Sequence, residues 1–367
     1  MAGMKKILFI ASHRLNRSPS QRFRFEQYIP YFIQNSFGCK LSPLVTEADD
    51  KVMYAEEKYF QKFLVIIKSF FRRLRNLRLA SSYDIIFIQR EAYLIGTTLF
   101  ERSFKRSGAK IVFDFDDAIW LMNVSDVNKR FSWIKRPSKT AEIIAMSDMV
   151  IAGNSYLAEY ARTYNPNVQI IPTTVDTDKF LPLKNSPVKD KVCIGWTGSH
   201  TTIKHFALAI PFLKELKKKY GDRIYFKVIG DSTYSLPELG IQGIKWNQDT
   251  EVLDLQEIDI GLMPLPDDVW SKGKCGLKSL EYMSLCIPPV ISPVGVNSEI
   301  VQDGVNGLLA KTNQEWVDKI SQLIESPELR RKIGLKGRET VVEKYSVNSQ
   351  KDVYLNLFNK LLSESKK

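Results

Sequence analysis

Residues 259–294 read "DIGLMPLPDDVWSKGKCGLKSLEYMSLCIPPVISPV" and hold two apolar runs with a basic, glycine-containing segment between them. The runs at 259–265 and 288–294 are short and compact, which is typical of buried parallel strands. Between them Gly273 and Gly276 permit a tight turn, and residues 277–285 have the pattern of a helix. The stretch therefore predicts a strand, a crossover helix and a second parallel strand.

The same alternation of apolar runs and helical segments extends along the whole chain. Further predicted strands are 6–11, 84–89, 110–117 and 149–154 in the first half, and 191–199 and 224–231 in the second. Proline, asparagine and lysine around 182–190 mark a linker between the halves. Two successive series of this kind predict an α/β protein with two doubly wound, Rossmann-like domains.

Length and composition narrow the class of protein. The chain has 367 residues, which suits two domains, and 44% hydrophobic with 26% charged residues excludes wholesale disorder. No run of 18 uncharged apolar residues predicts a membrane-spanning helix, and the short run at 6–11 favours a strand over a signal peptide. The separated cysteines and histidines lack metal-ligand spacing. We therefore expect a cytoplasmic protein without a metal or cofactor.

A net charge of +12 favours a polyanionic partner such as a phosphate-bearing molecule, a nucleic acid or an anionic membrane surface. Much of the excess lies in residues 57–80, which predict a basic amphipathic helix. Its apolar stripe would hold Phe63, Ile66, Ile67, Phe70, Phe71 and Leu74. Such a helix can lie at the inner face of the cytoplasmic membrane. The alternative is an ordinary surface helix docked on a sheet.

The first strand leads into a basic, serine-containing loop, "SHRLNRSPSQRFRFEQY", at residues 12–28. Backbone N–H groups at a helix N-terminus, together with arginine side chains, form a ready anion site. Neither a G-x-G-x-x-G nor a Walker sequence is present, so a dinucleotide fingerprint and a P-loop find no support. The candidate ligands of an acceptor or its phosphate are Arg14, Arg17, Ser18, Gln21, Arg22, Arg24 and Arg90.

Strand ends in the second half also favour an anion. In "GWTGSHTTIKH" (195–205), the small residues Gly198 and Ser199 let a phosphate approach the backbone, and Lys204 could reach it. The strand at 224–231 ends in a glycine and an aspartate. Lys278 lies near the start of the helix predicted at 277–285, where the helix dipole favours an anion.

Three segments then occur in the order found in a known family: "IIPTTVDTDKF" (170–180), "GSHTTIKH" (198–205) and "GLKSLEYMSLCIPPVISPVGVNSEIVQDGVNGLLA" (276–310). The chain resembles, over nearly its whole length, the retaining glycosyltransferases of family 4, which have the GT-B fold. The resemblance implies two Rossmann-like domains that face each other across a cleft. It implies an acceptor domain at 1–183, a nucleotide-sugar domain at 190–345 and a terminal helix at 346–367 that crosses back to the first domain.

The resemblance also implies roles for single residues. Glu281 matches the glutamate that binds the ribose hydroxyls, and Lys204 matches the lysine that binds the donor pyrophosphate. The implied donor-binding set is Gly198, Ser199, Lys204, Gly230, Asp231, Gly273, Lys274, Cys275, Gly276, Leu277, Lys278 and Glu281. Asp116 and Asp117 fall where many relatives have a His-Asp pair, so the catalytic candidates are Asp116, Asp117, Lys204 and Lys274.

Three positions depart from the family pattern. Gly273 stands where the first signature glutamate is expected, Ser199 replaces the loop arginine, and Asp116 replaces the histidine. We hypothesise that Lys274 or Lys278 replaces the missing arginine electrostatically. "DFDD" at 114–117 contains an Asp-x-Asp string, which we interpret as acceptor-side carboxylates rather than a metal site.

The implied activity is metal-independent transfer of a hexose from a nucleotide sugar to a saccharide or lipid-linked acceptor, as in polysaccharide or lipopolysaccharide synthesis. Alternatives are a sugar-nucleotide epimerase of similar shape, a degenerate transferase, and a non-catalytic basic protein that binds anionic lipid or nucleic acid. A nucleic-acid partner is not expected, because no aromatic-basic or helix-turn-helix pattern occurs.

Overall fold

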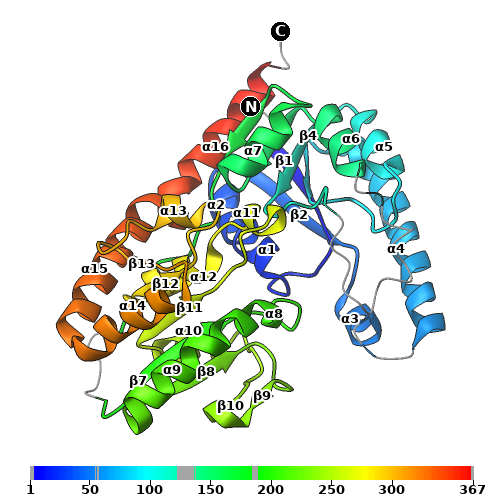
Figure 1. The fold of residues 1–367 in the computed structure, drawn as a ribbon. Coiled ribbons are helices and arrows are strands. Elements are labelled where there is room, and N and C mark those ends of the chain that lie inside the picture. The colour runs from blue at the N-terminus through cyan, green and yellow to red at the C-terminus, as the bar shows by residue number, and fades with distance from the viewer. Residues whose placement is uncertain are drawn as a thin grey trace. The chain divides into compact units, whose positions relative to one another are not determined.

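The computed structural model describes residues 4–53, 55, 58–121, 136, 138–183 and 189–364. The chain divides into two compact units (Figure 1). The first unit holds the residues up to Pro172 and those from Lys351 onward, and the second unit spans Thr173–Gln350. The predicted domain boundaries lie at 183 and 346, whereas the two compact units divide after Pro172 and before Lys351.

A six-stranded parallel sheet with the order β2-β1-β3-β4-β5-β6 forms the centre of the first unit. The predicted strands are confirmed as β1 (Lys5–Ala11), β3 (Ile85–Gln89), β4 (Lys110–Phe115) and β5 (Met149–Ala152). The sequence did not predict β2 (Phe37–Pro43) and β6 (Val168–Ile170). Both lie at the edges of the sheet and are only partly buried, so neither shows a compact apolar run.

Helices cover this sheet on both faces, and α4, α5 and α6 lie in a row on one of them (Figure 1). Phe9, Phe25 and Phe87 are fully buried and pack together in the core. The helices of the unit are α1 (Pro19–Arg22), α2 (Ile29–Gln34), α3 (Glu47–Met53), α4 (Tyr59–Leu79), α5 (Leu99–Lys105), α6 (Lys139–Met146), α7 (Ser155–Arg162) and α16 (Val347–Ser363).

The terminal helix α16 returns to the first unit, as predicted. The Tyr354 hydroxyl donates a hydrogen bond to the backbone carbonyl of Arg24 at 3.0 Å. The ring centroids of Tyr354 and Tyr28 are 4.7 Å apart, and those of Phe358 and Phe32 are 5.2 Å apart. Aromatic burial therefore fixes the end of the chain on the sheet where the chain began.

The second unit has a five-stranded parallel sheet with the order β13-β12-β11-β7-β8, and a small antiparallel pair. The predicted strands are confirmed as β7 (Val192–Thr197), β8 (Ile224–Ile229), β11 (Ile260–Met263) and β12 (Pro289–Ile291). The sequence did not predict the two-residue strands β9 (Ser235–Leu236), β10 (Ile241–Gln242) and β13 (Leu308–Leu309), which are too short for a periodic pattern.

The helices of the second unit include the predicted helix at 277–285, confirmed as α12 (Leu277–Ser284). The core of the second unit contains Trp196 and a parallel stack of Phe212 on Trp316, with ring centroids 4.7 Å apart. The other helices are α8 (Ile203–Phe206), α9 (Ile210–Tyr220), α10 (Glu251–Gln256), α11 (Val269–Lys272), α13 (Asn297–Ile300), α14 (Asn313–Glu325) and α15 (Pro327–Lys344).

Candidate functional site

Two loops at the carboxyl ends of β7 and β8 pack backbone against backbone. The Gly198 N–H donates to the Ile229 carbonyl at 2.9 Å, and the Ser199 N–H donates to Thr202 Oγ1 at 2.8 Å. Gly230 has φ +131°, and a Cβ placed there would lie 2.2 Å from the Gly198 carbonyl oxygen. Glycine is therefore required at Gly230, and the two predicted phosphate-binding loops form one joined surface.

Asp231 fixes this joined surface in place. Its carboxylate accepts hydrogen bonds from the Thr233 N–H at 2.9 Å and the Thr233 hydroxyl at 2.6 Å, and it contacts His200 Nδ1 at 2.7 Å. The bonds from Thr233, with a further contribution from His200, lower the pKa of Asp231. The side chain is thus an ionised clamp between the two loops.

Three lysines gather around one histidine in the second unit. Lys204 and His205 lie on α8, Lys274 lies in the turn before α12, and Lys278 lies in the first turn of α12. Burial and then the charges of Lys278, Lys274 and Lys204 together lower the pKa of His205 to about 4, while Asp268 opposes them. The fold therefore brings the predicted cations of two distant segments together.

Aromatic rings support two of these lysines. The Lys274 ammonium lies 5.3 Å from the centre of the Trp270 ring, and the Lys278 ammonium lies 5.5 Å from that of Trp196. A cation over an aromatic face keeps its charge while its apolar stem is covered. The lysines are therefore held near the carboxyl edge of the sheet.

The turn from Gly273 to Leu277 leads into α12 through Gly276, which has φ +69°. A Cβ at Gly276 would lie 2.3 Å from Ile300 Cδ1, so only glycine fits. Gly273 and Cys275 are buried in the turn, and Leu277 is half-buried. Glu281 lies three positions after Lys278 on α12 and is 6% exposed. Residues at this spacing share one face of a helix.

In the first unit, Asp116 and Asp117 follow β4 and share one arginine. Arg90, directly after β3, has its Nε 2.8 Å from Asp116 Oδ1 and its Nη2 2.7 Å from Asp117 Oδ2. Its backbone adopts φ +63°, which is uncommon outside glycine. The structure thus joins a predicted acceptor ligand to both predicted catalytic carboxylates.

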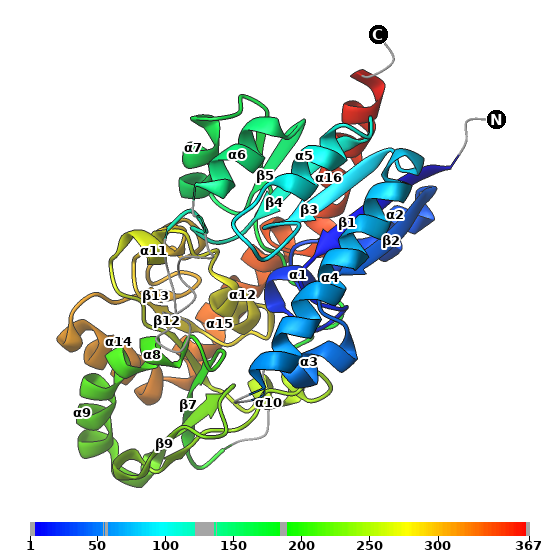
Figure 2. The ribbon, with the colours of Figure 1, turned by 90° about the vertical axis from the view of Figure 1, so that its right-hand side faces the viewer.

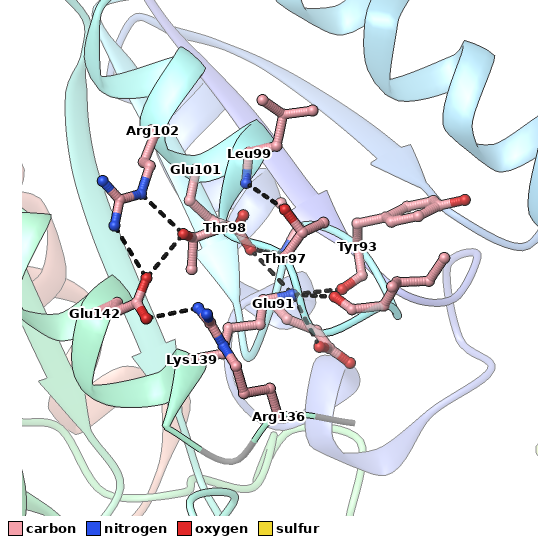
Figure 3. A network of polar contacts seen from close by, with 12 residues as sticks. Glu91, Tyr93, Thr97, Thr98, Leu99, Glu101, Arg102, Arg136, Lys139 and Glu142 are labelled. Carbon is pink, nitrogen blue, oxygen red and sulfur yellow. Dashed lines mark hydrogen bonds and ion pairs between the residues drawn. The ribbon is translucent and has the colours of Figure 1, made fainter. Parts of the chain in front are cut away.

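The loop after Arg90 is held by the buried Lys139 of α6 (Figure 3). The Lys139 ammonium donates to the Tyr93 carbonyl at 2.5 Å and the Ile95 carbonyl at 3.2 Å, and it lies 3.2 Å from Glu91 Oε2 and 3.4 Å from Glu101 Oε1. This network sets the course of the chain that leaves Arg90.

The side chains of the predicted anion loop at 12–28 differ in how far contacts within the first unit bury them. The side chain of Arg24 is 0% exposed, with Nη2 2.5 Å from Asp114 Oδ1 and Nη1 donating to the Ile171 carbonyl at 2.5 Å. The Gln21 side chain receives the His13 N–H at 2.7 Å. These contacts make both side chains part of the core, and no surface of Arg24 remains for an acceptor.

Arg14, Arg17 and Ser18 of this loop lie closer to solvent, whereas Arg22 is buried at 7% exposed. Arg17 Nε is 2.8 Å from Asp50 Oδ2, and the Arg17 side chain is 39% exposed. Arg14 is similarly exposed and lies 3.6 Å from the same carboxylate. Ser18 contacts the Ser20 hydroxyl at 3.0 Å, and the Arg22 guanidinium lies 4.8 Å from the centre of the Phe23 ring.

Sequence analysis did not identify His13 and Asp50, which lie among the charged residues near Arg17 and Arg90. Burial lowers the pKa of His13, Arg17 and Arg90 lower it further, and Asp50 raises it. His13 follows β1 almost directly, so the rule that directs attention to strand ends could have found it. Asp50 comes from α3, and no local signal connects it to the strand end.

Comparisons with known proteins agree with this architecture. Residues 183–340 match the family described as glycosyl transferases group 1. The poly(ribitol-phosphate) alpha-N-acetylglucosaminyltransferase of Staphylococcus aureus (strain COL) is 36% identical over 87 residues, which are 23% of this chain and 18% of that protein. The putative glycosyltransferase EpsD of Bacillus subtilis (strain 168) is 34% identical over 84 residues, 22% of each chain. The match thus spans about a fifth of these curated relatives.

Solved structures match over nearly the whole chain. The sucrose-phosphate synthase of Thermosynechococcus elongatus has a TM-score of 0.68 at 14% identity and covers 98% of this chain and 100% of its own. Anabaena Alr3699/HepE in complex with UDP and glucose has a TM-score of 0.67 at 14% identity, over 97% and 100%. These likenesses establish the predicted fold class, GT-B with two Rossmann-like units. Together with the family match they support a glycosyltransferase of the group 1, GT-B type.

Among the residues that the structure describes, no three His, Cys, Asp or Glu side chains gather in a way that could hold a metal ion. In the same residues, no helix is both long and apolar enough to cross a membrane.

Proposed function

We propose that the chain is a retaining transferase of glycosyltransferase family 4 that moves a hexose from a nucleotide-sugar donor to a saccharide or lipid-linked acceptor. The observation that carries this proposal is the cluster of Lys204, Lys274 and Lys278 around His205, inside the segment that matches the group 1 family. Departure of a nucleoside diphosphate develops negative charge on its terminal phosphate. Preorganised cations stabilise that charge more in the transition state than in the ground state.

The donor is held by the same unit. The small loop at Gly198 and Gly230 admits the phosphates, and the N-terminus of α12 adds the favourable end of a helix dipole. The Glu281 carboxylate accepts hydrogen bonds from the two ribose hydroxyls. Ser199 stands where the family pattern has an arginine, and Lys274 and Lys278 supply the positive charge that this arginine would have carried.

The acceptor binds in the first unit. The cluster of Arg90, Asp116 and Asp117 orients the attacking hydroxyl, and its carboxylates favour the positive sugar centre. Arg14 and Arg17 are exposed enough to reach a phosphate on the acceptor. The lysines of the second unit take the place of a metal at the leaving group, so we expect the rate to be unchanged by a chelator.

Two relatives guide the choice of substrates. The name of the Staphylococcus aureus relative specifies a poly(ribitol-phosphate) acceptor, and HepE was solved with UDP-glucose. We therefore place the reaction in the synthesis of a cell-envelope polysaccharide, lipopolysaccharide or glycolipid at the cytoplasmic face of the membrane. UDP-sugars are the first donors to test, and phosphate-bearing polymers and lipid-linked saccharides are the first acceptors.

The test is a thermal-shift screen of the full chain with UDP-, GDP-, ADP- and dTDP-sugars, followed by assays of diphosphate release. We expect one nucleotide class to raise the melting temperature, and release of its diphosphate only when an acceptor is added. No shift with any of the four classes would overturn the proposal. Conversion of the donor sugar without an acceptor would indicate an epimerase, and donor binding without turnover on any acceptor would indicate a degenerate transferase.

A further inference from the structure

Helix α4 turns a polar face toward the first unit. The Arg73 side chain is 0% exposed: its Nε donates to the Ala92 carbonyl at 2.6 Å, its Nη1 to the Ser42 carbonyl at 3.0 Å and its Nη2 to the Ala11 carbonyl at 2.9 Å. Burial lowers the pKa of Arg73 to about 9. Hydrogen bonds to backbone carbonyls of other segments, together with the buried side chain of Val65, thus attach this face of the helix.

Further contacts fix how α4 is rotated about its axis. Asn76 donates to the Ser42 hydroxyl at 2.6 Å, and the Tyr93 hydroxyl donates to the Ile66 carbonyl at 2.8 Å. The Phe70 ring packs on Phe100 with centroids 5.3 Å apart. The helix therefore cannot rotate to bury another side without breaking these bonds.

The opposite side of α4 carries exposed apolar side chains. In Figure 2 this helix runs along the side of the first unit that faces the viewer. The exposed fractions are 72% for Phe60, 55% for Phe63, 38% for Leu64, 36% for Ile67 and 63% for Phe71. These positions recur at the helical spacing of three and four residues, so they form one continuous stripe. We call these five residues the outward stripe. Single exposed apolar residues are normal on a protein surface, but a stripe this long is not.

The sequence predicted a different stripe. Of its six apolar residues, Phe63, Ile67 and Phe71 belong to the outward stripe, whereas Ile66, Phe70 and Leu74 are half-buried. The alternative of an ordinary surface helix docked on the first unit holds for the inward side of α4, where Val65 and Arg73 are buried. The hydrogen bonds of Arg73 and Asn76 place the polar side inward.

The surroundings of the outward stripe are basic. Residues 59–79 contain no aspartate or glutamate. Lys68, Arg75 and Arg78 are exposed beside or beyond the stripe, and none of them forms an ion pair within the described residues. Arg72 differs, because it pairs with Asp49 at 3.0 Å. An apolar stripe flanked by unpaired cations complements a surface with apolar depth and negative charge.

We propose that the outward stripe of α4 docks the protein on an anionic lipid surface. The 21-residue helix is about 30 Å long and lies parallel to the membrane plane, with the aromatic side chains at the boundary between headgroups and acyl chains. Lys68, Arg75 and Arg78 contact the anionic headgroups. This inference does not depend on the proposed transfer, since lipid binding requires no nucleotide sugar.

The experiment measures binding of the full chain to vesicles of phosphatidylcholine with about 30% phosphatidylglycerol and to vesicles of phosphatidylcholine alone, at low and high salt. We expect binding only to the anionic vesicles, and less at high salt. The triple variant Phe63→Ser, Ile67→Ser, Phe71→Ser should bind anionic vesicles at least about tenfold more weakly than the unchanged protein. The triple variant Lys68→Gln, Arg75→Gln, Arg78→Gln should lose the preference for anionic lipid.

The matched control is Leu253→Ser, Leu335→Ser, Val342→Ser, which removes three apolar residues that are 64%, 46% and 44% exposed in the second unit. It should bind vesicles like the unchanged protein. Failure of the unchanged protein to bind anionic vesicles, or equal binding by the first triple variant, would overturn the proposal. So would a dimer in solution that the first triple variant dissociates, because the stripe would then be covered by a second copy. The thermal shift with nucleotide sugars should be the same in all four proteins, which separates this result from the proposed function.

Discussion

The two parallel sheets of this protein carry contrasting charge at their carboxyl edges. In the first unit the arginines face carboxylates: Arg24 pairs with Asp114, and Arg90 pairs with Asp116 and Asp117. In the second unit the lysines at 204, 274 and 278 converge on His205, and Asp268 opposes their effect on its pKa. The first edge holds its arginines in ion pairs within the fold, whereas the second gathers three lysines around one histidine, where a bound anion would add favourable interactions.

This difference explains why one basic chain can contain two kinds of arginine and lysine. A buried ion pair contributes to a fixed geometry, and breaking it leaves a charge without solvation. A cation held over an aromatic ring at an edge stays available to a ligand. Breaking the buried Arg24–Asp114 pair of the first unit should therefore act mainly on stability, and removing the lysines of the second unit should act mainly on binding and turnover.

The largest effect is expected when the compensation in the first unit is removed. Asp114→Asn leaves the Arg24 guanidinium buried without its carboxylate, and both side chains are 0% exposed. We expect the free energy of unfolding, measured in urea, to fall by about 3–5 kcal/mol. The double variant Arg24→Met, Asp114→Leu removes both charges and should recover most of the loss. A decrease below about 1 kcal/mol for Asp114→Asn would show that the buried Arg24 guanidinium does not depend on the Asp114 carboxylate.

The next effect concerns the excess charge of the second unit. Lys204→Gln, Lys274→Gln and Lys278→Gln should each lower kcat/KM for the nucleotide sugar, with Lys204→Gln the most severe at about 100-fold. Steady-state kinetics of diphosphate release measure this loss. The matched control is Lys272→Gln, which removes the same charge from an exposed lysine 3.6 Å from Asp267. Unchanged turnover in all three variants would contradict the role of the cluster.

A smaller effect is expected where Arg90 holds two carboxylates at once. Arg90→Lys keeps the charge but loses the fork that spans Asp116 and Asp117 at 2.8 and 2.7 Å. We expect kcat to fall about tenfold with the donor affinity unchanged, because only the acceptor side is disturbed. The control Arg136→Lys alters an arginine that pairs with Glu142 at 2.6 Å and is 47% exposed. Weaker donor binding by Arg90→Lys, with normal acceptor kinetics, would reverse this assignment.

Local pattern was enough to predict the parts of this molecule that depend on neighbouring residues. Buried strands such as β1 and β11 show compact apolar runs, and the glycine turn before α12 was visible from composition. The Arg24–Asp114 pair was not predictable, because its members lie 90 positions apart. The sequence also showed which positions of α4 are apolar, but it did not show which side of the helix packs on the first unit. That choice depends on carbonyls that Arg73 reaches on other segments.

His13, which follows β1, and His205 on α8 give the finest comparison of the two units. The pKa of His205 is lowered from its ordinary value of 6.5 to about 4, first by burial and then by the three lysines. The pKa of His13 is lowered by burial as well, but Asp50 opposes that change. Between pH 4 and 6.5 the unfolded chain binds a proton at position 205 that the folded chain does not. Stability should therefore fall as pH decreases through this window, by about 1–3 kcal/mol, and His205→Asn should remove that part of the slope.

Ligand binding should separate the two histidines. A nucleoside diphosphate bound by the lysines would offset their charges and raise the pKa of His205 by about one unit, which NMR titration of the imidazole can measure. The pKa of His13 should stay constant, because the charges around it are already compensated by Asp50. If the diphosphate binds but both pKa values move equally, or neither moves, the lysines around His205 are not the groups that hold it. If only the pKa of His205 rises, the lysines around His205 respond to the anion while the surroundings of His13 do not, in the same molecule and under the same conditions.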